Sequence, residues 1–137
     1  MIEIADESEV SRATLYNHYR DKSAVIAALV AAEIEHLVDL ATKAGTPADA
    51  LATLSIAISS DSSLASMRVH DAPALVAALT HAEDPLYLTL AQCLYAATKS
   101  EAGTGLAMRW LLGQVMQPIT EKQSQEQAAL LVEGTLF

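Results

Sequence analysis

A repeated signal for the start of a helix constrains this chain more than any other feature. Thr46-Pro47, Asp71-Ala72-Pro73 and Asp84-Pro85 each place a side-chain oxygen just before a proline. The oxygen can accept hydrogen bonds from the free N–H groups of a first helical turn, where the missing N–H of proline does no harm. Between these signals, apolar residues recur at spacings of three and four. The pattern predicts an all-α protein.

The composition agrees with this fold class. Hydrophobic residues make up 52% of the chain and aromatic residues 4%, and the alternation typical of strands is missing. Glycines at 45, 103 and 105 are expected to break the chain between helices. We expect helices over residues 3–8, 11–19, 23–44, 47–59, 64–69, 72–81, 85–102, 106–117 and 124–137.

Two of the expected helices bear on the organisation of the chain. The helix of residues 23–44 has a polar face of Glu35, Asp39 and Lys43, spaced four residues apart, and would link a small head to a larger body. The helix of residues 85–102 carries no charge before Lys99, so we expect it at the centre of a bundle. The predicted domains are a head with its connecting helix, residues 1–44, and a body, residues 45–137.

The sequence favours a cytoplasmic protein. No apolar run reaches the roughly 18–20 residues that span a bilayer. The first residues lack the basic region and apolar core of a secretory signal. A single cysteine, Cys93, cannot form an internal disulfide. We therefore expect no contact with a membrane.

The net charge of −9 argues against a general nucleic-acid binder, because such proteins neutralise many phosphates. The charge is unevenly distributed, however. Residues 1–22 hold five acidic and three basic residues, and all three bases, Arg12, Arg20 and Lys22, follow position 11. Between positions 12 and 22 the field is therefore locally positive, and net charge alone does not exclude DNA.

Residues 3–22 predict two short helices joined by a tight connection. Ser11 is a good N-cap for the second helix, which turns Leu15 and Tyr19 inward and Arg12 and Tyr16 outward. A polar helix presented in this way is the arrangement of a helix-turn-helix, whose second helix enters the major groove of DNA.

The segment Ile4-Ala5-Asp6-Glu7-Ser8-Glu9-Val10-Ser11-Arg12-Ala13-Thr14-Leu15-Tyr16-Asn17-His18-Tyr19-Arg20-Asp21-Lys22-Ser23 resembles the DNA-binding signature of TetR-type transcriptional regulators. The resemblance implies base contacts from the start of the second helix, where Arg12 could bind a guanine edge. It also implies phosphate contacts from hydroxyl, imidazole and ammonium groups. The DNA-binding residues expected on this basis are Ser11, Arg12, Ala13, Thr14, Tyr16, Asn17, His18 and Lys22.

Two features depart from the family pattern. Glu9 stands where the family usually has a glycine, and it adds a negative charge near the phosphates. Met1 stands almost where the second helix of the family begins, so the helix that packs across the head is missing. We expect the head to be poorly ordered or rearranged, or the chain to start further upstream.

The resemblance also implies a function for the body. In the family, the last two helices of each subunit form a four-helix bundle with those of a second subunit, and central helices enclose a small apolar effector. The interface residues expected here are Leu106, Trp110, Leu111, Val115, Ala128, Leu131, Val132 and Leu136, which could instead close the core of a single chain. The expected pocket residues are Met67, His70, Tyr87, Cys93, Tyr95, Met108 and Gln114, each of which could equally be ordinary core.

Catalysis and cofactors are not expected. The histidines, at positions 18, 36, 70 and 81, lack the spacing of metal ligands, and Cys93 has no second sulfur nearby. Gly103-Thr104-Gly105 lacks the lysine of a phosphate-binding loop. The sequence thus favours a homodimeric repressor that a small apolar molecule releases from its DNA operator. The alternative is a helical dimerisation or protein-interaction module that has lost DNA binding, which Glu9 and the acidic charge favour.

Overall fold

The computed structural model describes residues 28–29, 31–80 and 85–135, and the chain divides into two compact units, Met1–Glu33 and Ile34–Phe137. The regular secondary structure of the described residues is helical, with no strand among them, which confirms the all-α prediction there. Residues 28–29 and 31–42 are helical. The following helices are α3 (Pro47–Ser60), α4 (Ser62–His70), α5 (Ala72–Leu79), α6 (Pro85–Thr98), α7 (Glu101–Met116) and α8 (Glu121–Thr135).

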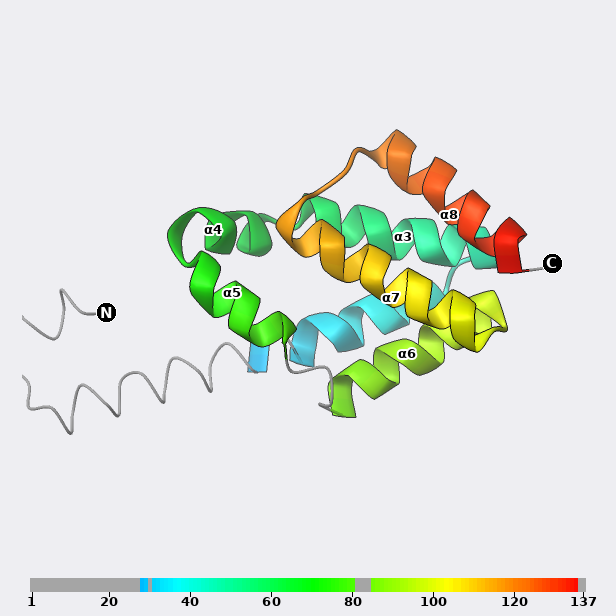
Figure 1. Cartoon of the computed structure of the whole chain (residues 1–137), viewed down its shortest axis with the longest axis horizontal. Helices are drawn as coiled ribbons and strands as arrows, with labels where there is room; N and C mark the ends of the chain where they lie inside the picture. The colour runs from blue at the N-terminus through cyan, green and yellow to red at the C-terminus, as the bar shows by residue number, and fades with distance from the viewer. Residues whose placement is uncertain (1–27, 30, 81–84, 136–137) are drawn as a thin grey trace, which may run out of the picture. The chain divides into compact units, whose positions relative to one another are not determined.

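The second unit is built around α3. This helix contacts α6, α7 and α8 (Figure 1), and it buries Leu51, Leu54, Ser55 and Ile58. Helix α7 runs in the same direction as α3, and α6 and α8 run in the opposite direction. The central helix is therefore α3, which carries apolar residues on more than one side.

The prediction that the uncharged segment after Pro85 forms the centre of the bundle is wrong. Helix α6 buries a single face, on which Leu90 and Leu94 lie, and leaves Leu88 and Tyr95 61% and 51% exposed. An absence of charge does not require burial, because much of the surface of any folded protein is apolar.

The expected capping residues begin several of the helices. The Thr46 hydroxyl accepts a hydrogen bond from the Asp49 N–H at 3.1 Å, directly before Pro47. Asp71 occupies the N-cap position of α5, but its side chain makes no capping hydrogen bond. Helix α8 begins earlier than predicted because Thr120 and Gln123 form a capping box, in which each side chain accepts from the backbone N–H of the other.

The boundary between α6 and α7 differs from the prediction. Gly103 and Gly105 do not break the chain, since both lie in the first turns of α7, where the Ser100 hydroxyl accepts from the Gly103 N–H at 3.0 Å. The break comes at Lys99, which adopts a left-handed backbone with φ of 56°. A lysine thus occupies a helix-ending conformation for which glycine is the usual residue.

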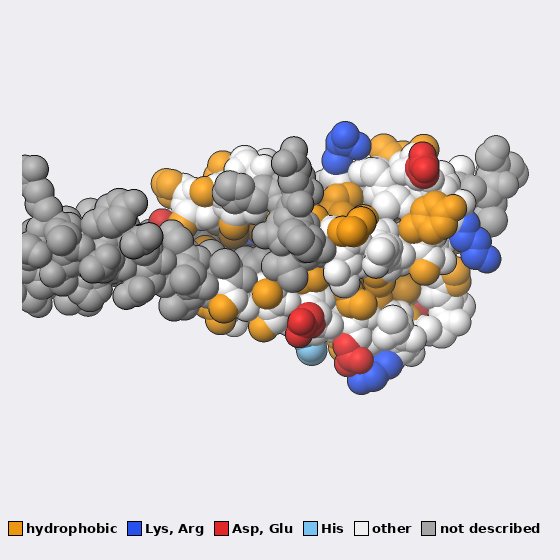
Figure 2. Space-filling view, turned by 90° about the horizontal axis from the view of Figure 1, so that it is seen from below, with side chains coloured by type: hydrophobic (Ala, Val, Ile, Leu, Met, Phe, Trp, Pro, Cys, Tyr) orange, Lys and Arg blue, Asp and Glu red, His pale blue; other side chains and the backbone are white. Residues whose placement is uncertain are grey.

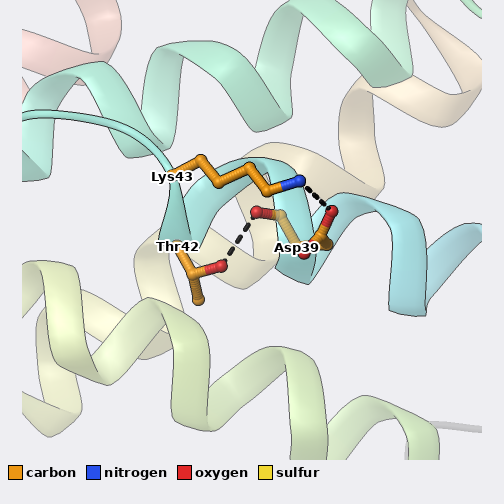
Figure 3. Close-up of polar contacts among 3 residues, drawn as sticks. All are labelled: Asp39, Thr42 and Lys43. Carbon is orange, nitrogen blue, oxygen red and sulfur yellow. Dashed lines mark hydrogen bonds and ion pairs between the residues drawn. The ribbon is translucent and has the colours of Figure 1, made fainter.

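The helix that ends at residue 42 lies partly in the second unit, which begins at Ile34. Its residues Ile34, Leu37 and Ala41 are buried, so this end of the helix packs as core. On its exposed side, the Lys43 ammonium lies 2.9 Å from an Asp39 carboxylate oxygen (Figure 3). This pair confirms the predicted polar face.

Candidate functional site

The predicted DNA-binding residues lie outside the part of the chain that the structure describes. This applies to Ser11, Arg12, Ala13, Thr14, Tyr16, Asn17, His18 and Lys22, and also to Glu9 and the expected rearrangement of the head. The candidate site is therefore formed by residues of the body.

The predicted pocket residues are distributed over α4, α6 and α7. His70 and Tyr95 are exposed, so the prediction that they line an interior pocket is not supported by their placement. Tyr87 is buried and donates a hydrogen bond from its hydroxyl to the Ala78 carbonyl at 2.9 Å, which ties α6 to α5. Met67, Cys93 and Met108 are partly buried.

Gln114 has the most distinctive surroundings among these residues. It lies on α7, is 3% exposed, and reaches a cluster of hydroxyl groups in the apolar core. Its Oε1 accepts hydrogen bonds from Ser55 Oγ at 2.6 Å and from Ser59 Oγ at 2.8 Å, both on α3. Ser55 Oγ also lies 2.6 Å from Ser124 Oγ on α8. We call Ser55, Ser59, Gln114 and Ser124 the buried polar cluster.

The cluster joins three helices and the loop between α7 and α8. The Ile119 N–H donates to Ser59 Oγ at 3.2 Å, which fixes that loop to the last turn of α3. Each hydroxyl carries one proton, so Ser55 can donate to Gln114 while Ser124 donates to Ser55. The hydrogen bonds therefore converge on the Gln114 carbonyl oxygen.

The other amide atom of Gln114 has no such contact. Its Nε2 is buried and finds no hydrogen-bond acceptor among the described residues. Rotating the amide by half a turn would exchange the two atoms and leave Oε1 unpaired instead. An unsatisfied buried polar atom costs about 1–3 kcal/mol. The cluster thus retains one unused hydrogen-bonding position inside the core.

Among the described residues, the hydrogen bonds of the cluster join only hydroxyl, amide and backbone groups, with no carboxylate or imidazole to activate a serine. Burial raises the pKa of the Cys93 thiol above its ordinary value, which keeps that thiol protonated and weakly nucleophilic.

The sequence analysis singled out Gln114 but missed the three serines around it. A signal for two of them was present. Ser55 follows Leu51 by four residues, within the apolar stripe of α3, and Ser124 precedes Ala128 by four residues on α8. A serine at a position that helical spacing assigns to the core is expected to find a polar partner there.

The predicted dimer interface requires a correction. Leu111, Val115 and Ala128 are 1%, 7% and 0% exposed within the single chain, so they have almost no surface left to bury against a second copy. These three residues belong to the core of the single chain, which was the alternative expectation for the interface residues.

The other described residues of the predicted dimer interface are only partly buried within the chain. Leu106 on α7 is 59% exposed, and Trp110, Leu131 and Val132 are partly buried. The Trp110 indole N–H donates to Gln127 Oε1 at 2.6 Å and joins α7 to α8. Leu130, which the prediction omitted, is 66% exposed on α8. Leu136 lies outside the described residues.

Among the described residues, no group of three or more histidine, cysteine or acidic side chains is placed to hold a metal ion. None of the helices formed by these residues combines the length and apolar character needed to cross a bilayer.

Comparisons of the chain with protein families, with curated proteins and with solved structures find no match. The resemblance of residues 4–23 to the TetR-type signature therefore depends on those residues themselves.

Proposed function

We propose that this chain is a ligand-responsive, DNA-binding transcriptional regulator of TetR type, acting as a homodimeric repressor. The observation that carries the proposal is the sequence of residues 4–23, which predicts a serine-capped polar helix followed by basic residues. Such a helix reads base edges through its first residues and grips phosphates with its hydroxyl and cationic groups.

The body supports the proposal through its exposed apolar residues. Leu106 and Leu130 leave most of their surface uncovered on α7 and α8, the last two helices described. Pairing these helices with those of a second copy would cover both side chains and bring two heads together. Two heads are what a DNA site with two half-sites requires.

An effector would act on the body, and Gln114 is the pocket residue that we retain for its recognition. A small, mainly apolar molecule with one oxygen could accept a hydrogen bond from the unpaired Gln114 Nε2. Binding that favours one spacing of the two heads would shift the dimer away from its DNA-bound form. The helix that ends at residue 42 would carry this change towards the head.

DNA binding can be tested by electrophoretic mobility shift with a labelled duplex from the region upstream of the chain's own reading frame. We expect a shift that unlabelled duplex of the same sequence competes away better than a scrambled duplex does. Arg12→Ala should weaken the specific complex by roughly tenfold or more, since a bidentate contact to guanine is worth about 1–3 kcal/mol.

Lys122→Ala provides the matched control. It also removes one positive charge, but from an ammonium that is 84% exposed on α8 and 3.8 Å from the Glu126 carboxylate. The control should bind like the unmodified chain. Equal losses in the two variants would mean that net charge, rather than base recognition, governs the binding, and this would contradict the proposal.

A second function is favoured by the acidic net charge of −9 and by Glu9. The chain would then be a helical dimerisation or protein-interaction module derived from such a regulator. It would form the same dimer but bind neither duplex at any salt concentration, so the experiment above separates the two functions.

A further inference from the structure

Helix α4 is held differently from the other helices of the second unit. None of its nine residues is buried. Val69 is 77% exposed, and Leu64 and Met67 are only partly buried. An isolated helix of this length is marginal in water, so α4 depends on contacts with the rest of the chain. It lies beyond the end of α3 and is followed directly by α5 (Figure 1).

Single residues that lie outside the helices flank α4 on both sides. Asp61 ends α3 and caps α4, with φ of −67° and ψ of 121°. Asp71 ends α4 and precedes α5, with φ of −153° and ψ of 51°. A short segment joined to its neighbours by single residues can unfold locally while those neighbours stay folded.

Arg68 connects α4 to the end of α7. Its Nη1 donates a hydrogen bond to the Val115 carbonyl at 2.5 Å in a partly buried position. Val115 lies in the last turn of α7, where carbonyl groups lack partners within the helix and the helix dipole favours a positive charge. A charged donor at this place is therefore a strong contact for a helix that buries no side chain.

We propose that α4 is a strap that detaches and unfolds as a unit between Asp61 and Asp71 while α3, α7 and α8 remain folded. Arg68 is the latch that sets how often the strap opens. A ligand or partner that binds only the open or only the closed form would shift this equilibrium. The inference concerns the body alone and holds whether or not the chain binds DNA.

Native-state hydrogen exchange of the full chain, followed by mass spectrometry of peptides, tests the strap. We expect the amides of residues 62–70 to exchange at least about tenfold faster than those of α3, because local opening requires less free energy than global unfolding. Arg68→Ala should accelerate exchange at residues 62–70 by about a further tenfold or more, since hydrogen bonds from charged groups are among the stronger ones. Exchange in α3 should not change.

Two further variants sharpen the test. Arg109→Ala is the matched control, because the Arg109 side chain makes an exposed 3.5 Å contact to Gly105 within its own helix, and it should leave exchange at residues 62–70 unchanged. Arg68→Lys keeps a charged donor and should restore part of the protection.

Three results would overturn the proposal. Equal exchange in α4 and α3 of the unmodified chain would show that α4 does not open separately, and this comparison needs no variant to fold. Faster amide exchange of both α3 and α4 in Arg68→Ala would show that Arg68 stabilises the whole fold rather than α4 alone. Unchanged exchange of α4 in that variant would show that Arg68 does not hold α4 closed.

Discussion

The hydroxyl groups of Ser55, Ser59 and Ser124 allow three helices to meet around one glutamine in a mainly apolar core. Polar networks of this kind specify an arrangement more sharply than apolar contacts do, because a displaced helix would leave several donors unpaired. The cluster therefore fixes the register of α8 and α7 against α3. Gln114 Nε2 is buried without a hydrogen-bond partner among the described residues, and this lowers the free energy of unfolding.

Ser55→Ala should lower the free energy of unfolding by about 1–3 kcal/mol, because the buried Ser124 hydroxyl on α8 loses its partner in the cluster and Gln114 Oε1 on α7 keeps only the hydrogen bond from Ser59. Urea unfolding followed by circular dichroism measures the change. Ser60→Ala is the control, since the Ser60 hydroxyl is exposed and bonds within its own helix to the Ile56 carbonyl. The control should change stability by less than about 0.5 kcal/mol. Equal losses of stability in the two variants would show that a hydrogen bond of the buried polar cluster contributes no more than an exposed one.

Cys93 should react more slowly with iodoacetamide in the folded chain than in urea at the same pH. Burial disfavours the thiolate, so the pKa of the folded thiol lies above its ordinary value, and the reactive form appears only at higher pH. Mass spectrometry of samples labelled across a range of alkaline pH values gives the two titration curves. A titration midpoint in the folded chain at or below the midpoint in urea would contradict the burial of the Cys93 thiol.

At the residue scale, the sequence identified the apolar stripes but not the serines within them. Helical spacing places Ser55 beside Leu51 and Leu54, yet it does not tell which polar partner from a distant helix will meet it. Gln114 is separated from Ser55 by 59 positions in the chain, and such pairings depend on the packing of whole helices.

At the scale of elements, capping chemistry predicted the starts of α3 and α5 but not those of α4, α7 and α8, and glycine misled the prediction of one break. Thr46-Pro47 begins α3 as expected. Gly103 and Gly105 lie inside α7, because the Ser100 cap starts the helix before them and only Lys99, which is left-handed, and Ser100 separate the two helices. Composition alone does not show which of several adjacent residues adopts the unusual backbone.

Lys99→Gly should raise the free energy of unfolding by up to about 1 kcal/mol. A left-handed backbone costs an ordinary residue about 1–2 kcal/mol, and the greater freedom of glycine in the unfolded chain offsets part of the gain. Gln92→Gly, at an exposed position inside α6, should instead lower stability by about 0.5–1 kcal/mol. Thermal and urea unfolding should show higher stability for Lys99→Gly and lower stability for Gln92→Gly. A destabilising Lys99→Gly would contradict the assigned role of Lys99 as the end of α6.

At the scale of the whole molecule, the apolar residues left exposed indicate where a second copy could bind. Figure 2 shows one face of the molecule, on which hydrophobic side chains reach the surface in separate places among charged and polar ones. Leu111, Val115 and Ala128 are buried inside the chain and therefore do not belong to the interface. Leu130 is exposed and is a candidate for it. The pattern of apolar residues alone does not separate these two groups, since both recur at helical spacing.

Leu106→Glu should convert a dimer into a monomer, because it places a charge in the proposed interface on α7. Leu88→Glu is the control, since Leu88 is equally exposed at 61% but lies on α6. Light scattering after gel filtration would report a mass near 14.5 kDa for Leu106→Glu and twice that for the control. Circular dichroism should show unchanged helix content in both variants. Loss of the dimer in both variants, or in neither, would remove α7 from the interface.

The most direct measurement of the central claim is sedimentation velocity of the full chain mixed with a labelled duplex from the region upstream of its own reading frame. The duplex should be long enough for two half-sites one helical turn apart. We predict that two chains, or a multiple of two, bind each duplex, with an affinity that falls steeply as salt increases. A duplex that sediments unchanged at every ratio of chain to DNA, even at low salt, would contradict the account.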